Sequence, residues 1–231
     1  QAYITFKQII KSAITDKYLP TNAMDMFEGI DKPKAEAKER RTLTEEEKAK
    51  IKDGNFRPMD KAFLLIIYGC GLRRGEAISL TRFDIDFKKK ELKVNKAITF
   101  DGNDPVIKDT KSKSGIRRVP MPDFLVAYLK DYVHTLKSPQ LFYTQGKENM
   151  TKSSYMKMWN RIRTEIGSED LTAHVFRHNF CTSLCYQIPT ISIKKIAQLL
   201  GDKEDMVMKV YNHIVMEKED AKTAINSGLA L

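Results

Sequence analysis

The sequence contains little cysteine, no long apolar run and none of the common metal-binding motifs. Its three cysteines, Cys70, Cys181 and Cys185, fall in apolar helical patterns, and this odd number argues against a disulfide framework and for a reducing compartment. No apolar run approaches the roughly 18 residues that span a bilayer, and no secretory signal opens the chain. His174, His178 and Cys181 have a spacing that could hold a metal, but neither a fourth ligand nor a CxxC or HExxH pattern supports such a site. We therefore expect a cytoplasmic protein without a metal.

The composition indicates a globular chain with a basic surface. The 231 residues are 42% hydrophobic, which is enough for one good-sized domain with a core and an appendage. The formal net charge is +10, and this balance favours a polyanionic partner, nucleic acid first, over a basic protein without such a role. Residue 1 is a glutamine rather than an initiator methionine, so we expect a fragment of a longer chain.

The chain divides into a leading segment, a charged linker and one large mixed domain. Residues 2–17 carry an apolar stripe that a single helix cannot bury alone, so we interpret them as the last helix of a missing domain. The stretch 31–41 is mostly charge, alanine and proline, which is typical of a solvated linker. The pattern of Thr44 and Glu47 predicts a capped helix start. Further helices are expected near residues 58–69, 74–80, 122–136, 152–165, 174–186, 191–200, 205–212 and 216–226, and a small antiparallel sheet of about three strands between 83 and 120. This order predicts a mostly helical α+β domain.

Arg73 is the first candidate for phosphate chemistry. It follows an apolar helix and a Gly-Cys-Gly-Leu segment, whose glycines permit a tight turn and a close approach to a ligand. Its planar guanidinium suits bidentate binding of a phosphate. Glu76 lies three residues on, on the same helical face, where it would hold that guanidinium. An ordinary salt bridge at a helix start is the alternative interpretation.

Four more residues complete a set that could cut a phosphodiester without a metal. Lys111 lies in a basic hairpin tip, where it would protonate a leaving oxygen or simply belong to a solvated turn. His174 and Arg177 share a helix face, so Arg177 would complete a phosphate clamp and His174 would move a proton, unless both are ordinary polar residues of an amphipathic helix. Tyr211, near the C-terminus, would attack the phosphorus, unless it is a core tyrosine. Each residue alone is weak evidence, but the ordered set indicates an enzyme.

The ordered set resembles the catalytic domain of the tyrosine recombinase (phage integrase) family, of the mobile-element integrase type. The matching segments are 71–76, 111–120, 174–178, 199–201 and 210–213. The resemblance implies the family's catalytic core, α+β and mostly helical, with a small antiparallel three-stranded sheet. It also implies three parts of the chain: residues 1–33 as the C-terminal remnant of a helical core-binding domain, 34–42 as a linker, and 43–231 as the recombinase catalytic domain.

The resemblance also implies roles for individual residues. Arg73 and Arg177 would be the paired phosphate-binding arginines, and His174 the histidine of the same helical motif. Lys111 would be the hairpin lysine that protonates the leaving 5′-oxygen. Tyr211 would be the nucleophile that forms a 3′-phosphotyrosine, so that DNA is cut and rejoined without ATP, cofactor or metal.

The accessory positions include one departure from the family. Glu76 matches an acidic accessory position, whereas Asp202 stands where the family usually has histidine or tryptophan as a hydrogen-bond donor. Because an ionised aspartate cannot donate, Asp202 would turn away, be replaced by Lys203, or reduce activity. Lys113 is the alternative to Lys111 and, with Arg117 and Lys203, a predicted DNA contact.

The resemblance implies a site-specific DNA recombinase of bacterial or phage origin. Its partners would be double-stranded DNA and further copies of the chain, forming a tetramer on DNA, with a monomer or weak association alone and no membrane. The tail after Tyr211, with a helix at 216–224, would dock on a neighbouring subunit. Two alternatives stay open: a type IB-like topoisomerase, and a DNA-binding protein with a decayed site, which Asp202 favours.

Overall fold

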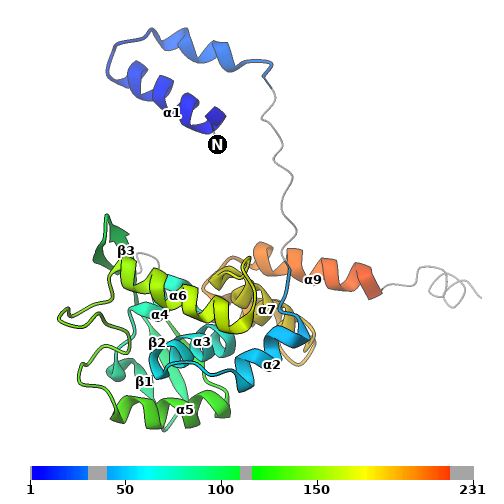
Figure 1. The fold of residues 1–231 in the computed structure, drawn as a ribbon. Helices are drawn as coiled ribbons and strands as arrows, with labels where there is room; N and C mark the ends of the chain where they lie inside the picture. Colours follow the sequence, from blue (N-terminus) through cyan, green and yellow to red (C-terminus); the bar gives the residue numbers. More distant parts are fainter. Residues whose placement is uncertain (1, 31–40, 110–115, 219–231) are drawn as a thin grey trace, which may run out of the picture. The chain divides into compact units, whose positions relative to one another are not determined.

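The computed structural model describes residues 2–30, 41–109 and 116–218, and for 216–218 it describes only the backbone. The chain separates into two compact units, residues 1–39 and 40–231 (Figure 1). No helix in the described ranges is long and apolar enough to cross a membrane. The predicted linker and the C-terminal tail fall largely outside the described residues.

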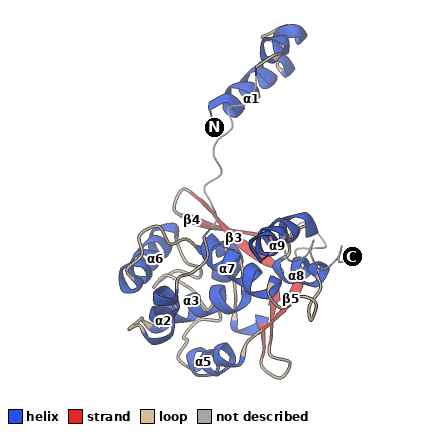
Figure 2. Ribbon diagram, turned by 90° about the vertical axis from the view of Figure 1, so that its right-hand side faces the viewer, coloured by secondary structure: helices blue, strands red, loops and turns tan. Residues whose placement is uncertain are grey.

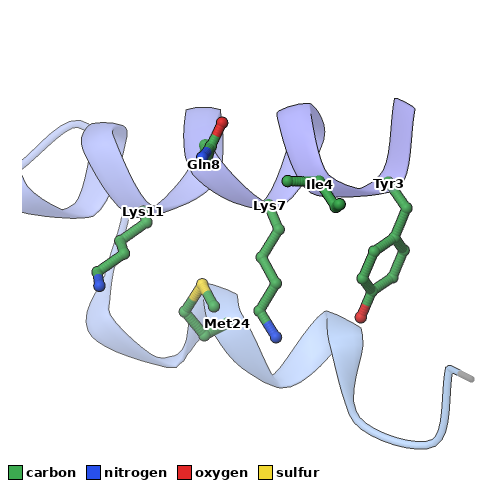
Figure 3. A pocket seen from close by; sticks show the side chains of 6 residues that line it. All are labelled: Tyr3, Ile4, Lys7, Gln8, Lys11 and Met24. Carbon is green, nitrogen blue, oxygen red and sulfur yellow. The ribbon is translucent and has the colours of Figure 1, made fainter. Parts of the chain in front are cut away.

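The smaller unit is a pair of helices. The long helix α1 (Ala2–Thr15) confirms the predicted leading helix, and the 3-10 helix η1 (Thr21–Phe27) folds back against it. The ring of Phe27 meets that of Tyr3 edge-on, with centroids 5.6 Å apart. Ile9 nevertheless stays exposed, so the pair leaves part of the apolar stripe uncovered. A shallow pocket between the two helices contains none of the predicted site residues; its lining is Tyr3, Ile4, Lys7, Gln8, Lys11 and Met24 (Figure 3).

The larger unit is built mainly of helices around a buried central helix, α3. Its helices are α2 (Glu45–Asp53), α3 (Pro58–Cys70), α4 (Arg74–Ile78), η2 (Arg82–Asp84), α5 (Asp123–His134), α6 (Lys152–Ile166), α7 (Ala173–Cys185), α8 (Ile193–Leu200) and α9 (Glu204–Lys218). Its strands are β1 (Ile85–Asp86), β2 (Glu91–Val94), β3 (Lys96–Asp101), β4 (Asp104–Asp109) and β5 (Arg117–Pro120). The predicted capping box is confirmed, because the Thr44 hydroxyl accepts from the Glu47 N–H and the Glu47 carboxylate accepts from the Thr44 N–H.

The central helix is held on several sides. Helix α3 packs against α4, α5, α6 and α7, and its residues 62–67 are all buried. The Phe63 ring meets the rings of Phe142, Tyr155 and Trp159 within about 6 Å, each nearly edge-on. This cluster holds the middle of α3, and the C-terminal end of the same helix leads to the first site arginine.

The strands form two separate antiparallel groups (Figure 2). A three-stranded sheet has the order β1-β2-β5, with Leu92 opposite Val119, and it confirms the predicted small sheet. Strands β3 and β4 form an additional two-stranded hairpin, with Ile98 opposite Ile107. Residues 110–115, which include the predicted hairpin lysines, lie between β4 and β5 and outside the described residues.

The C-terminal part of the larger unit corrects one prediction. We expected separate helices at 205–212 and 216–226, but α9 is continuous from Glu204 to Lys218. Its residues Val207, Val210, Tyr211 and Ile214 recur at helical spacing and all pack on a second apolar cluster with α7 and α8. Because this single apolar stripe packs on one surface along its length, α9 stays one continuous helix. The polar Asn212-His213 pair after Tyr211 does not end it.

Candidate active site

The position of Arg73 follows from the way α3 ends. Gly71 caps the helix in the left-handed conformation, with φ +60°, and a Cβ there would lie 2.5 Å from the Phe180 ring. The chain then turns, and Arg73 becomes the N-cap of α4. The Glu76 carboxylate accepts from the Arg73 backbone N–H at 2.9 Å and from its Nη1 at 3.0 Å. The predicted contact between these two residues is confirmed.

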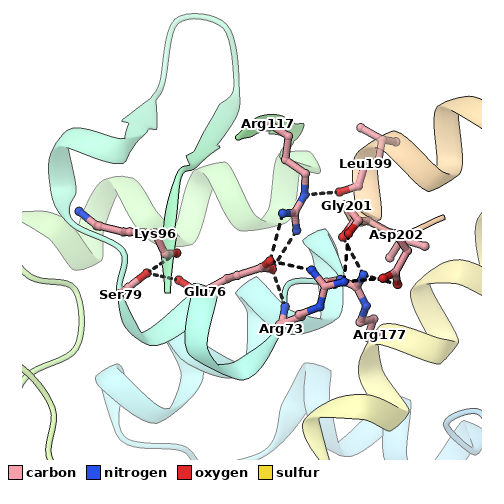
Figure 4. Close-up of polar contacts among 11 residues, drawn as sticks. Arg73, Glu76, Ser79, Lys96, Arg117, Arg177, Leu199, Gly201 and Asp202 are labelled. Carbon is pink, nitrogen blue, oxygen red and sulfur yellow. Dashed lines mark hydrogen bonds and ion pairs between the residues drawn. The ribbon is translucent and has the colours of Figure 1, made fainter. Parts of the chain in front are cut away.

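Glu76 is bound from the other side by Arg117. Arg117 Nη1 and Nη2 donate to the two carboxylate oxygens of Glu76 at 3.1 and 2.8 Å, and the two side chains are only 3% and 4% exposed. Burial alone would raise the pKa of Glu76, but the hydrogen bonds and charge of Arg117 outweigh it and hold that pKa below its usual range. The carboxylate is thus a fixed anion between two guanidiniums (Figure 4).

The buried position of Arg117 does not fit the DNA contact that we predicted for it. Its Nε donates to the Leu199 carbonyl at 2.7 Å, while both Nη atoms are held by Glu76. A guanidinium that is buried with these donors engaged is not at the surface where a DNA backbone would pass. We assign Arg117 instead to positioning Glu76, and through it Arg73.

The C-terminal end of α8 binds all three arginines. The last carbonyls of an α-helix have no partner within the helix and carry the negative end of its dipole. Arg117 Nε donates to Leu199 O, as above; Arg177 Nη2 donates to Leu200 O at 2.7 Å, and Arg73 Nη2 donates to Gly201 O at 3.0 Å. The helix end therefore holds three guanidiniums close together.

Arg177 lies deeper in the site than Arg73. Its side chain is 9% exposed, against 40% for Arg73, and its Nη1 donates to the Gly71 carbonyl at 2.9 Å. Burial and the neighbouring Arg73 charge lower the pKa of Arg177, yet a guanidinium stays a cation in a protein. Helices α3, α7 and α8 together fix its position through the two carbonyls and through packing.

Asp202 contacts the Nη2 atoms of both Arg73 and Arg177. Its Oδ2 accepts from Arg177 Nη2 at 2.5 Å, and its Oδ1 accepts from Arg73 Nη2. Burial would raise its pKa, but the two guanidiniums outweigh this and lower it, so the side chain is ionised at neutral pH. The Asp202 side chain has therefore not turned away from the arginines in this structure.

The remaining predicted residues lie on α7, on α9, directly after Asp202, or outside the described chain. His174 is exposed in the first turn of α7, one turn before Arg177. Tyr211 is half-buried on α9 and packs on the apolar cluster of α7 and α8. Lys203 is exposed directly after Asp202. Lys111 and Lys113 belong to the residues that the structure does not describe.

Sequence reasoning missed how the carbonyls hold the arginines. The sequence predicts a helix near 191–200, and Gly201 caps the corresponding helix α8 with φ +64°. The unpaired carbonyls that such an end exposes were a usable signal, since basic groups are their natural partners. The sequence does not indicate which arginines these carbonyls bind, because the Arg73 donor and the Gly201 acceptor are separated by 128 residues.

The arrangement can bind one small oxyanion. Two guanidinium N–H groups from different helices converge on the two oxygens of one carboxylate, and a phosphate diester offers the same pair of oxygens. Within the described ranges, no three side chains of histidine, cysteine, aspartate and glutamate gather closely enough to hold a metal ion. The positive charge of this site comes from its arginines.

The sequence is similar to those of tyrosine recombinases. The chain is 28% identical to a tyrosine recombinase XerC-like protein of Caldanaerobacter subterraneus, over 95% of this chain and 63% of the relative. It is 30% identical to the tyrosine recombinase XerA of Pyrococcus furiosus, over 81% of this chain and 65% of the relative. The chain thus spans just under two thirds of the length of these two relatives.

Solved structures show the same fold. The Tn1549 transposon integrase in complex with a circular intermediate DNA matches with a TM-score of 0.69 and 20% identity, over 92% of this chain and 76% of that one. The XerA recombinase matches with a TM-score of 0.60 and 19% identity, over 99% of this chain and 82% of that one. These structures confirm the predicted fold class. In addition, residues 39–218 match the family model described as "Phage integrase family". With that model covering most of its length, the chain is a member of the phage integrase family.

Proposed function

We propose that this chain is the catalytic part of a DNA strand-exchange enzyme. The observation that carries the proposal is the arginine pair: Arg73 and Arg177 each donate one N–H to the Asp202 carboxylate, and backbone carbonyls hold both guanidiniums. A phosphodiester in that position would have its developing negative charge stabilised by guanidinium donors that the backbone carbonyls already hold in place. The relatives, which are named tyrosine recombinases, support the same reaction class.

The reaction runs through a covalent intermediate. The Tyr211 oxygen attacks the phosphorus, the bond to the 5′-oxygen breaks, and a 3′-phosphotyrosine remains. His174 takes the tyrosine proton, and Lys111 or Lys113 gives a proton to the leaving 5′-oxygen. Attack of another 5′-hydroxyl reverses the step and joins new strands, so the reaction needs no ATP.

The partners follow from this chemistry. The net charge of +10 favours double-stranded DNA, and the Tn1549 transposon integrase is solved with DNA. Exchange between two sites needs several active copies, so we propose a homo-oligomer, a tetramer, on DNA and a monomer or weak association without it. The three cysteines of the chain are free and buried, which fits a cytoplasmic protein that is bacterial or phage-encoded.

The two units also receive proposed identities. Residues 1–33 would be the end of a helical core-binding domain, 34–42 a linker, and 43–231 the catalytic domain. The exposed apolar side chains of α1 support the first of these, because they fit a helix whose neighbours belong to a larger domain. The predicted docking of the tail on a neighbouring subunit concerns residues that lie outside the described chain, and it stays a prediction.

The decisive experiment traps the covalent intermediate. Duplexes from a randomised pool, each nicked near its centre, lose the short 5′-hydroxyl strand after cleavage, so an adduct accumulates and is recovered from a denaturing gel. Wild type should form the adduct, and Tyr211→Phe should form none while it still shifts DNA in a native gel. Tyr186→Phe, at an exposed tyrosine next to the end of α7, is the matched control and should react like wild type.

The outcomes separate the alternatives. An adduct that persists in Tyr211→Phe would place the nucleophile elsewhere. DNA binding without any adduct would support a decayed site. An enzyme that relaxes supercoiled DNA but does not exchange strands between two copies of the selected sequence would be a topoisomerase.

A further inference from the structure

The donors of the arginine pair are divided in a regular way. Each Nη2 atom carries two hydrogens. Arg73 Nη2 gives one to the Gly201 carbonyl and one to Asp202, and Arg177 Nη2 gives one to the Leu200 carbonyl and one to Asp202. If the Asp202 carboxylate left, each arginine would keep its carbonyl contact and expose one N–H pointing at the vacated position (Figure 4).

We propose that Asp202 is an internal competitor of the DNA phosphate, whose carboxylate fills the anion site of Arg73 and Arg177 in the DNA-free protein and must swing out before the phosphate enters. The inference rests on the proposed function and deepens it, because it says how access to that site is controlled. The carboxylate oxygens take one N–H from each arginine, as the two non-bridging oxygens of a phosphodiester would. Both anions carry one negative charge, so they exclude one another from this site.

The surroundings of Asp202 permit the movement. Its side chain is 29% exposed, whereas the other carboxylate of the cluster, Glu76, is 4% exposed and held by Arg117. The Asp202 backbone N–H donates to the Ala197 carbonyl at 3.0 Å, which belongs to the cap of α8 and does not involve the side chain. A rotation about χ1 can therefore take the carboxylate into solvent while the helix end and the arginines stay in place.

The charges of the cluster explain what the movement of the Asp202 carboxylate would achieve. Three guanidiniums and two carboxylates leave it with one net positive charge. Glu76 is buried and stays, so it orients Arg73 and Arg117 in every state. Asp202 is the removable partner, and it keeps free anions out of the site until a DNA phosphate, positioned by the rest of the basic surface, displaces it.

The test measures anion binding without DNA. Isothermal titration with inorganic phosphate compares wild type with Asp202→Asn and Asp202→Ser. The asparagine amide is neutral and turns a donor NH2 group, in place of the second acceptor oxygen, toward one guanidinium, and the serine side chain is shorter. Both variants should bind phosphate at least about tenfold more tightly, which corresponds to about 1.4 kcal/mol. Asp205→Asn removes the same charge from an exposed position of α9 and should bind like wild type. Arg73→Gln added to Asp202→Asn should abolish the gain.

A second arm follows the wild-type protein, so the result does not depend on the folding of a variant. The carboxyl carbon of Asp202, observed by NMR, should shift when phosphate saturates the site, because the carboxylate leaves both guanidiniums. An unchanged resonance at saturating phosphate would overturn the inference, and so would variants that bind phosphate no more tightly than wild type.

The nicked-duplex assay separates this inference from the proposed function. If the variants bind phosphate more tightly but no protein forms an adduct, the competitor is real and the recombinase assignment fails. If wild type forms the adduct while Asp202→Asn binds phosphate no better and cleaves more slowly, the function stands and Asp202 is a positioning residue instead.

Discussion

Arg73 and Arg177 have the same charge but differ in what else depends on them. Arg73 is 40% exposed and contacts Glu76, Gly201 and Asp202, whereas Arg177 is buried and binds the Gly71 and Leu200 carbonyls. Replacing Arg177 by alanine leaves two buried carbonyls without this donor, and replacing Arg73 leaves a half-open position that water can enter.

Alanine at either arginine should slow adduct formation by about 10²–10³-fold, because each supplies a donor to the transition-state charge. DNA affinity should fall by less than about tenfold, since one contact among many phosphate contacts is lost. Arg177→Ala should also lower the free energy of unfolding by about 2 kcal/mol, while Arg73→Ala should change it little. Single-turnover rates, filter binding and urea unfolding measure the three quantities.

Arg177→Lys is the informative control. It keeps the charge but loses the planar fork that reaches two carbonyls and an anion at once, so cleavage should stay low. Near wild-type cleavage in this variant would mean that charge alone is required at position 177.

Glu76→Gln should destabilise the protein by about 3 kcal/mol at neutral pH, because it leaves buried Arg117 without its anion. The folded pKa of Glu76 lies below its ordinary value of 4.5, so the unfolded chain binds the proton more readily as pH falls. The stabilisation is complete above pH 4.5 and is lost as pH falls through the folded pKa. Urea unfolding from pH 7 to 3 should therefore show the gap between wild type and variant closing below pH 4.5.

Asp60→Asn controls for the loss of a buried ion pair elsewhere. Asp60 is 2% exposed and accepts two hydrogen bonds from Arg161, each 2.7 Å, about 15 Å along α3 from the end that leads to the site. It should lower stability but leave the cleavage rate of the folded protein unchanged. If Glu76→Gln and Asp60→Asn slowed cleavage equally, Glu76 would have no particular role in orienting Arg73.

The C-terminal end of α8 acts as a unit, and Gly201 tests it. A Cβ at this position would lie 2.8 Å from Arg117 Nη1, and Arg117 cannot shift easily because Glu76 and Leu199 hold it. Gly167 caps α6 with φ +80°, and a Cβ added there would meet no atom within 4 Å, so the two glycines differ in their surroundings.

Gly167→Ala should cost about 1 kcal/mol, the penalty of a left-handed conformation for alanine, with no effect on cleavage. Gly201→Ala should cost more, about 2–3 kcal/mol, and should slow adduct formation at least tenfold, because the carbonyls that aim the arginines move. Thermal unfolding and the nicked-duplex assay report both. Equal effects of the two substitutions on cleavage would show that the helix end does not position the arginines.

The charge of the whole molecule sets how DNA binding responds to salt. With a net charge of +10, affinity should fall steeply as salt rises, with a log–log slope of about −0.9 for each phosphate contacted. Lys203→Ala should make the slope less steep by about 0.9 if this exposed residue touches the DNA backbone. Fluorescence anisotropy over a series of salt concentrations gives the slope; a flat response would mean that the basic surface faces away from DNA.

Several parts of this protein could be read from local pattern because their causes are local. The apolar spacing of α1 and α3, the Thr44–Glu47 capping box, the Gly201 cap and the Arg73–Glu76 contact each depend on groups within a few residues of one another. The order of the motifs also predicted the family, and the match to the family model confirms this prediction. The predicted break within α9 was wrong, since a continuous apolar stripe outweighed the polar pair that follows Tyr211.

Contacts across long stretches of chain were decided only by the packing of the helices. The sequence predicted that Arg117 contacts DNA at the surface. In the structure it is the buried partner of Glu76, 41 residues away, because β5 lies beside α8. In the sequence, Asp202 was a departure from the family pattern. In the structure its carboxylate binds Arg73 and Arg177, which lie 129 and 25 residues before it in the chain. Local spacing carries no information on such pairs, because which charge meets which depends on where α8 ends relative to α3 and α7. The residue types therefore came from the sequence, and their partners came from the fold.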